Sequence, residues 1–104
     1  MQKILIDTFI VPEEIKSTFL EEVRKGLAFL RTIPGYVEGY IYKKTDGESL
    51  YNVVTTAVWE SEEAFANARK IAVINFEKTG FNPQEIIKRL NVQMERAVYE
   101  REPY

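Results

Sequence analysis

The chain has 104 residues, enough for one hydrophobic core, and we expect a single domain over residues 1–104. Its 45% hydrophobic and 29% charged residues are typical of a globular protein, and a net charge of −2 gives no general attraction for nucleic acid or membranes. It has no apolar run of roughly 20 residues and no N-terminal apolar stretch like that of a signal peptide, so we expect a cytoplasmic location.

Two residue types that carry much of enzyme chemistry are missing, because the chain has neither Cys nor His. A thiolate nucleophile, a thiolate metal site and a disulfide are therefore excluded, and so are the commonest general base and the usual haem ligand. No Gly-rich dinucleotide fingerprint follows the first strand-like segment. We expect no haem, flavin or metal cofactor. Any chemistry would use the remaining polar side chains or the substrate's own reactivity.

The first third of the chain predicts a strand and a helix. Residues 3–11 are apolar almost throughout, which indicates a strand covered on both faces. Pro12 begins a helix that ends before Pro34-Gly35. The apolar stripe of this helix consists of Ile15, Phe19, Val23, Leu27 and Leu30.

Residues 36–44 and 49–59 predict the two strands of a hairpin, with a turn at Asp46-Gly47. The first of these strands carries three tyrosines at even positions, so alternation places them on the same face: Tyr36, Tyr40 and Tyr42. Alternation along the second strand places Tyr51, Val53, Thr55, Ala57 and Trp59 on one face. If this face points toward the helices, its residues line whatever cavity lies there.

The remainder predicts two helices and an edge strand. Ser61 is placed to cap a helix that ends at Gly80, and Asn82-Pro83 begins a shorter one. The inward stripe of the longer helix consists of Phe65, Ala68, Ala72 and Phe76. Residues 91–101 alternate imperfectly and carry charges, as is typical of an edge strand.

This element order predicts an α+β domain with the ferredoxin-like βαββαβ topology and a four-stranded antiparallel sheet. The first and third strands lie centrally in that topology, and both are apolar on two faces. Helices can cover only one face of such a sheet. We therefore expect a homodimer in which the second face of the sheet packs against its copy.

Three segments, in order and at their spacings, resemble the antibiotic biosynthesis monooxygenase family. They are Phe9-Ile10-Val11-Pro12-Glu13, Pro34-Gly35-Tyr36, and Val58-Trp59-Glu60-Ser61-Glu62-Glu63-Ala64-Phe65. The resemblance implies a dimeric α+β barrel. It also implies one of several activities: cofactor-independent oxygenation of polyketide or quinol-type substrates, haem degradation, or isomerisation of small sugars.

The family patterns match only in part. In the polyketide oxygenases an Asn lies four residues before the family's Trp and a Tyr six residues after it; around Trp59 these positions hold Thr55 and Phe65. In the haem-degrading members an Asn on the first strand works with a His on the second helix. Here the strand position is Asp7 and the chain has no His, which argues against that mechanism.

Asp7, Trp59 and Arg69 are the candidate catalytic residues. Asp7 is a carboxylate within an apolar strand, so it is either a general base for an acidic phenol or the partner of Arg69 or Arg96 in an ion pair. Trp59 either stacks on a substrate or packs in the core. Arg69 either holds an anionic substrate oxygen or lies exposed on the surface.

The candidate substrate-binding residues are Tyr51, Thr55, Phe65 and Phe76. With the catalytic candidates they predict a cofactor-independent monooxygenase that oxidises a small aromatic, quinol or polyketide-type substrate with O₂. The alternative is a non-catalytic dimeric binding or interaction protein whose own side chains fill the cavity. Thr55 and Phe65, in place of polar partners, favour the alternative, whereas Asp7 favours the enzyme. An isomerase or hydrolase is a third interpretation, weakened by the lack of His and Cys.

Overall fold

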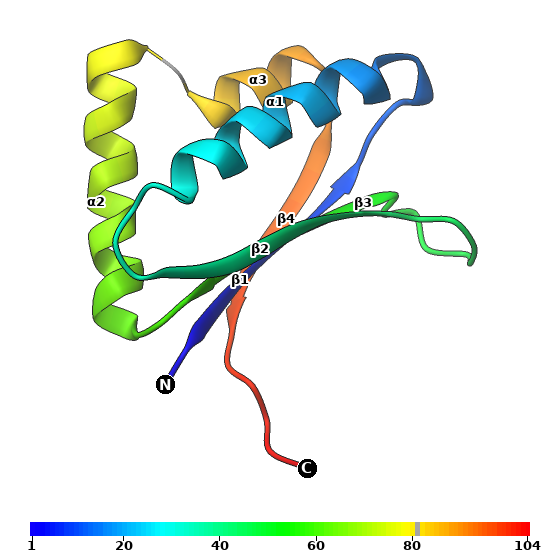
Figure 1. The fold of residues 1–104 in the computed structure, drawn as a ribbon. Coiled ribbons are helices and arrows are strands. Elements are labelled where there is room, and N and C mark those ends of the chain that lie inside the picture. The colour runs from blue at the N-terminus through cyan, green and yellow to red at the C-terminus, as the bar shows by residue number, and fades with distance from the viewer. Residues whose placement is uncertain (81) are drawn as a thin grey trace.

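In a computed structural model, which describes residues 1–80 and 82–104, the chain forms one four-stranded antiparallel sheet in the order β2–β3–β1–β4. The strands are β1 (Lys3–Ile10), β2 (Tyr36–Lys43), β3 (Val53–Trp59) and β4 (Gln93–Tyr99). The helices are α1 (Lys16–Leu30), α2 (Glu62–Thr79) and α3 (Pro83–Arg89), and a 3-10 turn, η1 (Glu13–Ile15), precedes α1. All three helices lie on one side of the sheet (Figure 1). The predicted α+β fold is confirmed, with β1 and β3 at its centre.

Local sequence signals fix the ends of the helices. The Ser61 hydroxyl accepts a hydrogen bond from the Ala64 backbone N–H at 3.0 Å, which caps α2. Gly80 ends α2 in the left-handed conformation, with φ 75°. The Asn82 side chain accepts from the Gln84 N–H at 3.0 Å, and Pro83 occupies the first turn of α3. These interactions agree with the predicted helix boundaries.

The third strand begins later than predicted, at Val53 instead of residue 49. The Asn52 side chain accepts from the Val11 N–H at 2.9 Å and donates to the Val11 carbonyl at 2.8 Å, so it ties the end of β1 to the β2–β3 connection. The chain before Asn52 therefore leaves the ladder. Residues 44–52 form a longer connection than the Asp46-Gly47 turn alone would give.

A register irregularity between Tyr36 and Glu38 changes the parity of β2. Tyr36 pairs with Trp59 and packs against its indole, whereas Tyr40 and Tyr42 pair with Thr56 and Val54, on the opposite face of β3. The shared parity predicted for the three tyrosines is therefore wrong. A bulge inserts one residue, and every side chain after it changes face.

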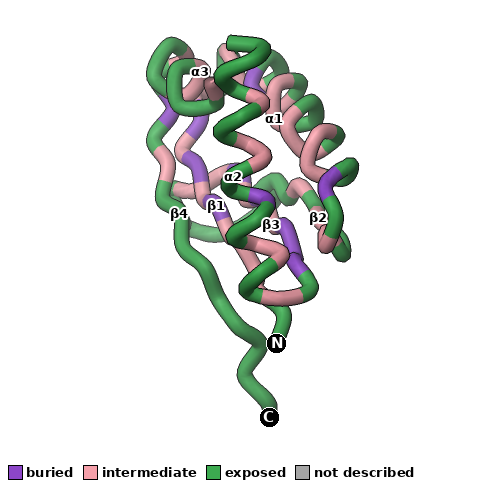
Figure 2. The backbone as a smooth tube through the Cα atoms, turned by 90° about the vertical axis from the view of Figure 1, so that its left-hand side faces the viewer, coloured by how far each residue is buried: buried purple, intermediate pink, exposed green. Residues whose placement is uncertain are grey.

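The core lies between the sheet and the helices, where Figure 2 shows the buried segments of β1 and β3. One cluster joins Phe9, Val11, Phe19, Val53 and Val92. A second joins Ile33, Ala57, Trp59 and Ala68. In the described residues, no helix is long and apolar enough to cross a membrane.

Candidate functional site

A cavity of about 390 Å³ lies between the sheet and the helices. Its floor comes from β1, β3 and β4, and its walls come from α1, α2 and α3. Most of the lining is apolar, including Phe19 and Leu27 of α1 and Phe76 of α2. This volume lies within the range of about 300–1,000 Å³ typical of small-molecule sites. The side chains that line the cavity therefore do not fill it.

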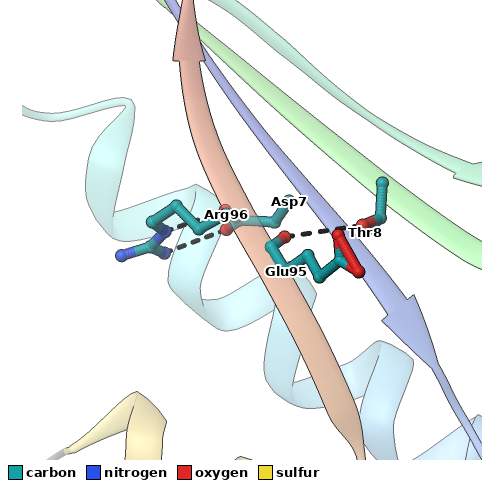
Figure 3. Close-up of polar contacts among 4 residues, drawn as sticks. All are labelled: Asp7, Thr8, Glu95 and Arg96. Carbon is teal, nitrogen blue, oxygen red and sulfur yellow. Dashed lines mark hydrogen bonds and ion pairs between the residues drawn. The ribbon is translucent and has the colours of Figure 1, made fainter.

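Asp7 lies in the floor of this cavity and is paired with Arg96. The two residues are opposite each other in the β1–β4 ladder. Arg96 donates from Nε to Oδ1 at 2.8 Å and from Nη2 to Oδ2 at 2.9 Å, as Figure 3 shows. The Asp7 side chain is only 9% exposed and that of Arg96 is 49% exposed. The structure thus selects Arg96, not Arg69, as the ion-pair partner, and these hydrogen bonds raise the pKa of Arg96.

Trp59 lines the cavity and is itself almost fully buried. The residue is 1% exposed, and its indole Nε1 has no hydrogen-bond partner among the described residues. The Tyr36 ring packs edge-on against the indole with centroids 5.6 Å apart, which fixes its orientation. A buried N–H without a partner costs free energy, and because this nitrogen has almost no accessible surface, it lies beneath the cavity wall rather than at its surface.

Arg69 and Phe65 form a pair on α2. The guanidinium carbon of Arg69 lies 4.4 Å from the centre of the Phe65 ring, and both residues line the cavity. This is the geometry of a cation–π contact. Phe65 packs against the cluster that contains Trp59, so the arginine is held next to the aromatic part of the site.

Six of the seven predicted site residues line the cavity, namely Asp7, Thr55, Trp59, Phe65, Arg69 and Phe76. Thr55 is the partner of Asp7 in the β1–β3 ladder, and both residues line the cavity. Tyr51 is not a lining residue, and its hydroxyl donates to the Glu95 carboxylate. Glu95 and Arg96 are neighbours in β4, so their side chains point to opposite faces of the sheet. Since Arg96 faces the cavity, Glu95 and its contact with Tyr51 lie on the outer face. The face predicted for Tyr51 is wrong, because residue 51 precedes β3.

Arg96 is the functional candidate that sequence reasoning missed, having considered it only as an ion-pair partner. Met94 and Arg96 share a parity in β4 and both line the cavity, so alternation along this strand was the available signal. The described residues contain no group of three or more Asp or Glu side chains that could hold a metal ion.

The family model for antibiotic biosynthesis monooxygenases matches residues 4–72, which is more than half of the chain. No curated protein sequence matches the chain significantly. Several solved structures share the fold at low sequence identity. SnoaB from Streptomyces nogalater, a cofactor-independent oxygenase, is 20% identical with a TM-score of 0.73, and the match covers 99% of this chain and 95% of SnoaB.

Two further structures share the fold. A candidate monooxygenase from Shewanella loihica is 21% identical with a TM-score of 0.69, and the match covers 99% of this chain and 96% of that one. A candidate antibiotic biosynthesis monooxygenase from Deinococcus radiodurans is 14% identical with a TM-score of 0.74, covering 98% and 94%. The family match and the shared fold agree, and the chain belongs to the antibiotic biosynthesis monooxygenase family.

Proposed function

We propose that the protein is a cofactor-independent monooxygenase that oxidises a small, electron-rich aromatic substrate. One observation carries the proposal: in a chain of this family, a cavity of about 390 Å³ that the described side chains leave open is lined by Trp59, Phe65 and Phe76 and by the cationic Arg69. The apolar walls suit an aromatic ring, and the guanidinium suits a carbonyl or phenolic oxygen on that ring.

The reaction we propose is the conversion of an activated CH₂ group, as in an anthrone, to a carbonyl. Loss of one proton gives a stabilised carbanion, which transfers its electrons to O₂ and forms a carbon–oxygen bond. Protonation gives a hydroperoxide, and loss of water from it leaves the carbonyl. One O₂ is consumed, with one oxygen atom entering the product and the other leaving as water. The substrate supplies all the electrons, so the reaction needs no cofactor.

Each cavity residue has a role in this proposal. Trp59, Phe65 and Phe76 contact the ring of the substrate. Arg69 adds positive charge on the α2 side. Asp7 accepts the proton, since Arg96 engages each carboxylate oxygen once and every such oxygen has a second lone pair.

A non-catalytic binding protein is the second candidate, and the same Asp7–Arg96 pair favours it. Both oxygens of the Asp7 carboxylate already accept a hydrogen bond from Arg96, and this engagement opposes the use of Asp7 as a base. The presence of Thr55 and Phe65 where the polyketide oxygenases have polar residues also favours a binding protein. Under this reading the cavity binds an aromatic ligand and releases it unchanged.

We also propose that the protein is a homodimer that packs through the outer face of its sheet. The helices leave this face uncovered (Figure 1). It carries Ile4, Ile6, Ile10, Val54, Tyr40 and Tyr42, by the parity of the strand pairs. Tyr40 and Tyr42 are about half exposed, at 51% and 52%. An uncovered sheet face that carries these apolar side chains favours a second copy of the chain.

Oxygen uptake tests the proposed function. The purified full-length protein is mixed with anthrone, without added cofactor, and O₂ consumption is compared with protein-free autoxidation. We expect catalysed uptake of one O₂ per anthraquinone, no hydrogen peroxide, and one atom of labelled oxygen in the product. An absence of catalysed uptake across a panel of anthrones and naphthols, together with tight binding of the same compounds, would support the binding protein instead.

A further inference from the structure

Among the charged side chains that line the cavity, Arg69 has no carboxylate partner within the described residues. In the part of the chain that the structure describes, four such side chains line it: Asp7, Glu22, Arg69 and Arg96. Asp7 is matched by Arg96, with N–O distances of 2.8 and 2.9 Å. Glu22 is matched by Lys25, with Nζ and Oε1 3.4 Å apart. Arg69 is left, and no carboxylate within the described residues pairs with it.

Arg69 is also held in place. Its guanidinium stacks on Phe65 at 4.4 Å, and Phe65 itself packs against the Trp59 cluster. Stacking uses the face of the guanidinium and leaves the N–H donors at its edge free. Arg69 is exposed and also lines the cavity, so these donors can meet a ligand that enters from the solvent.

We propose that the ligand of this cavity is an aromatic carboxylate, whose acid group binds the free edge of Arg69 while its ring lies among the apolar walls. A guanidinium edge presents two parallel N–H donors that match the two oxygens of a carboxylate. The ring of Trp59, which also lines the cavity, packs against the same ring system. Recognition uses two kinds of contact, a charged one at Arg69 and an apolar one along the walls.

This inference rests on the proposed function, because it takes the cavity as the substrate site, and it names the class of substrate. Unlike the proposed reaction, the inference requires only that the ligand binds. Binding of the carboxylate does not depend on Asp7 or on O₂, so the inference can be tested without turnover.

The test compares two probes of nearly the same shape, 1-naphthoate and the neutral 1-naphthalenemethanol. Binding to the full-length protein is measured by calorimetry and by the fluorescence of Trp59, the only tryptophan of the chain. We expect 1-naphthoate to bind about tenfold more tightly than the alcohol at low salt, as is typical of charge-assisted hydrogen bonds. The difference should shrink as ionic strength rises, because Arg69 is exposed.

Arg69→Gln should abolish the preference, so that 1-naphthoate and the alcohol bind this variant with about the same affinity. Arg69→Lys should restore part of it, since the charge returns without the two-donor edge. Lys70→Gln is the matched control, because it removes the same charge from the next position of α2, at a residue that does not line the cavity. It should keep the preference.

Equal affinity for the two probes in the unmodified protein would overturn the inference. So would a preference that survives Arg69→Gln, or failure of both probes to bind. A clear preference for the carboxylate without any O₂ uptake would leave the inference standing and remove the oxygenase. O₂ uptake without the preference would overturn the inference and leave the oxygenase standing.

Discussion

Asp7 and Arg96 face each other across β1 and β4 and are joined by two parallel hydrogen bonds, one to each carboxylate oxygen. The aspartate lies in the cavity floor, whereas the arginine extends from an edge strand and remains half exposed. The pair therefore connects the interior of the site to the rim of the sheet.

Removing the arginine should destabilise the fold. Arg96→Gln leaves the Asp7 carboxylate buried without its partner, which should lower the free energy of unfolding by about 1–3 kcal/mol. Urea unfolding of Arg96→Gln, Asp7→Asn and the double variant gives the coupling between the two residues. The double variant should lose less stability than the two single variants together. The exposed pair Lys3–Glu100 is the control, with little coupling expected. Strictly additive effects at Asp7 and Arg96 would contradict the importance of the pair.

The kinetic roles of Asp7 and Trp59 should separate. In the proposed oxygenase, Asp7→Asn should lower kcat with anthrone by roughly 100-fold, the scale of a lost general base. Trp59→Phe keeps an aromatic ring but removes the free N–H, and we expect it mainly to raise KM. Steady-state O₂ uptake measures both effects. An Asp7→Asn protein with unchanged kcat would show that deprotonation does not depend on this carboxylate.

Gly26 offers a way to fill the cavity from α1. It lines the cavity, and a Cβ built there meets nothing within 4 Å. Gly26→Leu should weaken binding of 1-naphthoate by about tenfold or more. It should leave the fold as stable or stabilise it by up to about 1 kcal/mol, because Leu is the better helix former. Calorimetry and thermal unfolding provide the two readouts.

Gly39→Ala is the contrasting variant, because a Cβ there would lie 2.5 Å from the Tyr36 hydroxyl and 2.7 Å from the Thr56 carbonyl. It should destabilise the fold. Unchanged ligand binding by a folded Gly26→Leu protein would place the ligand outside this cavity.

The outer face of the sheet should hold two copies together. Light scattering at micromolar concentration should give about twice the chain mass of 12.1 kDa. Ile6→Glu places a charge on that face and should yield a folded monomer. Ile74→Glu makes the same change on α2, at a residue already 49% exposed, and should leave the dimer intact. A folded monomer in the unmodified protein would exclude the sheet-to-sheet dimer.

Alkaline pH should loosen the region around Trp59. Burial raises the pKa of Tyr36 above its usual value of 10.0, so the fold favours the neutral phenol. That contribution to stability is complete below the unfolded-state pKa and is lost as pH rises through the folded-state pKa. The free energy of unfolding, followed by Trp59 fluorescence, should therefore decline above about pH 10.

Tyr36→Phe should reduce this decline, because a phenylalanine cannot ionise. Tyr51→Phe serves as a comparison, since the hydrogen bond to Glu95 raises the pKa of Tyr51 on the other face of the sheet. A decline that Tyr36→Phe leaves unchanged would assign it to other groups.

The sequence by itself determined the fold class and the ends of the helices. Ser61, Gly80 and Asn82 act on backbone groups within a few residues of themselves, so their effect is legible without knowledge of the distant chain. The central position of β1 and β3 follows from element order. The anomaly of Asp7 was also visible, because a carboxylate in an apolar strand demands a partner.

Only the tertiary structure decided which partner Asp7 takes, where Tyr51 and Tyr36 point, and that the cavity is unfilled. The pairing of Asp7 with Arg96 depends on the register between β1 and β4, and the two residues are 89 positions apart in the sequence. The faces of the two tyrosines depend on where β3 begins and on a bulge in β2. Cavity volume depends on how far three helices stand from one sheet. Each of these features results from many contacts between residues that lie far apart in the sequence, so local propensity does not predict it.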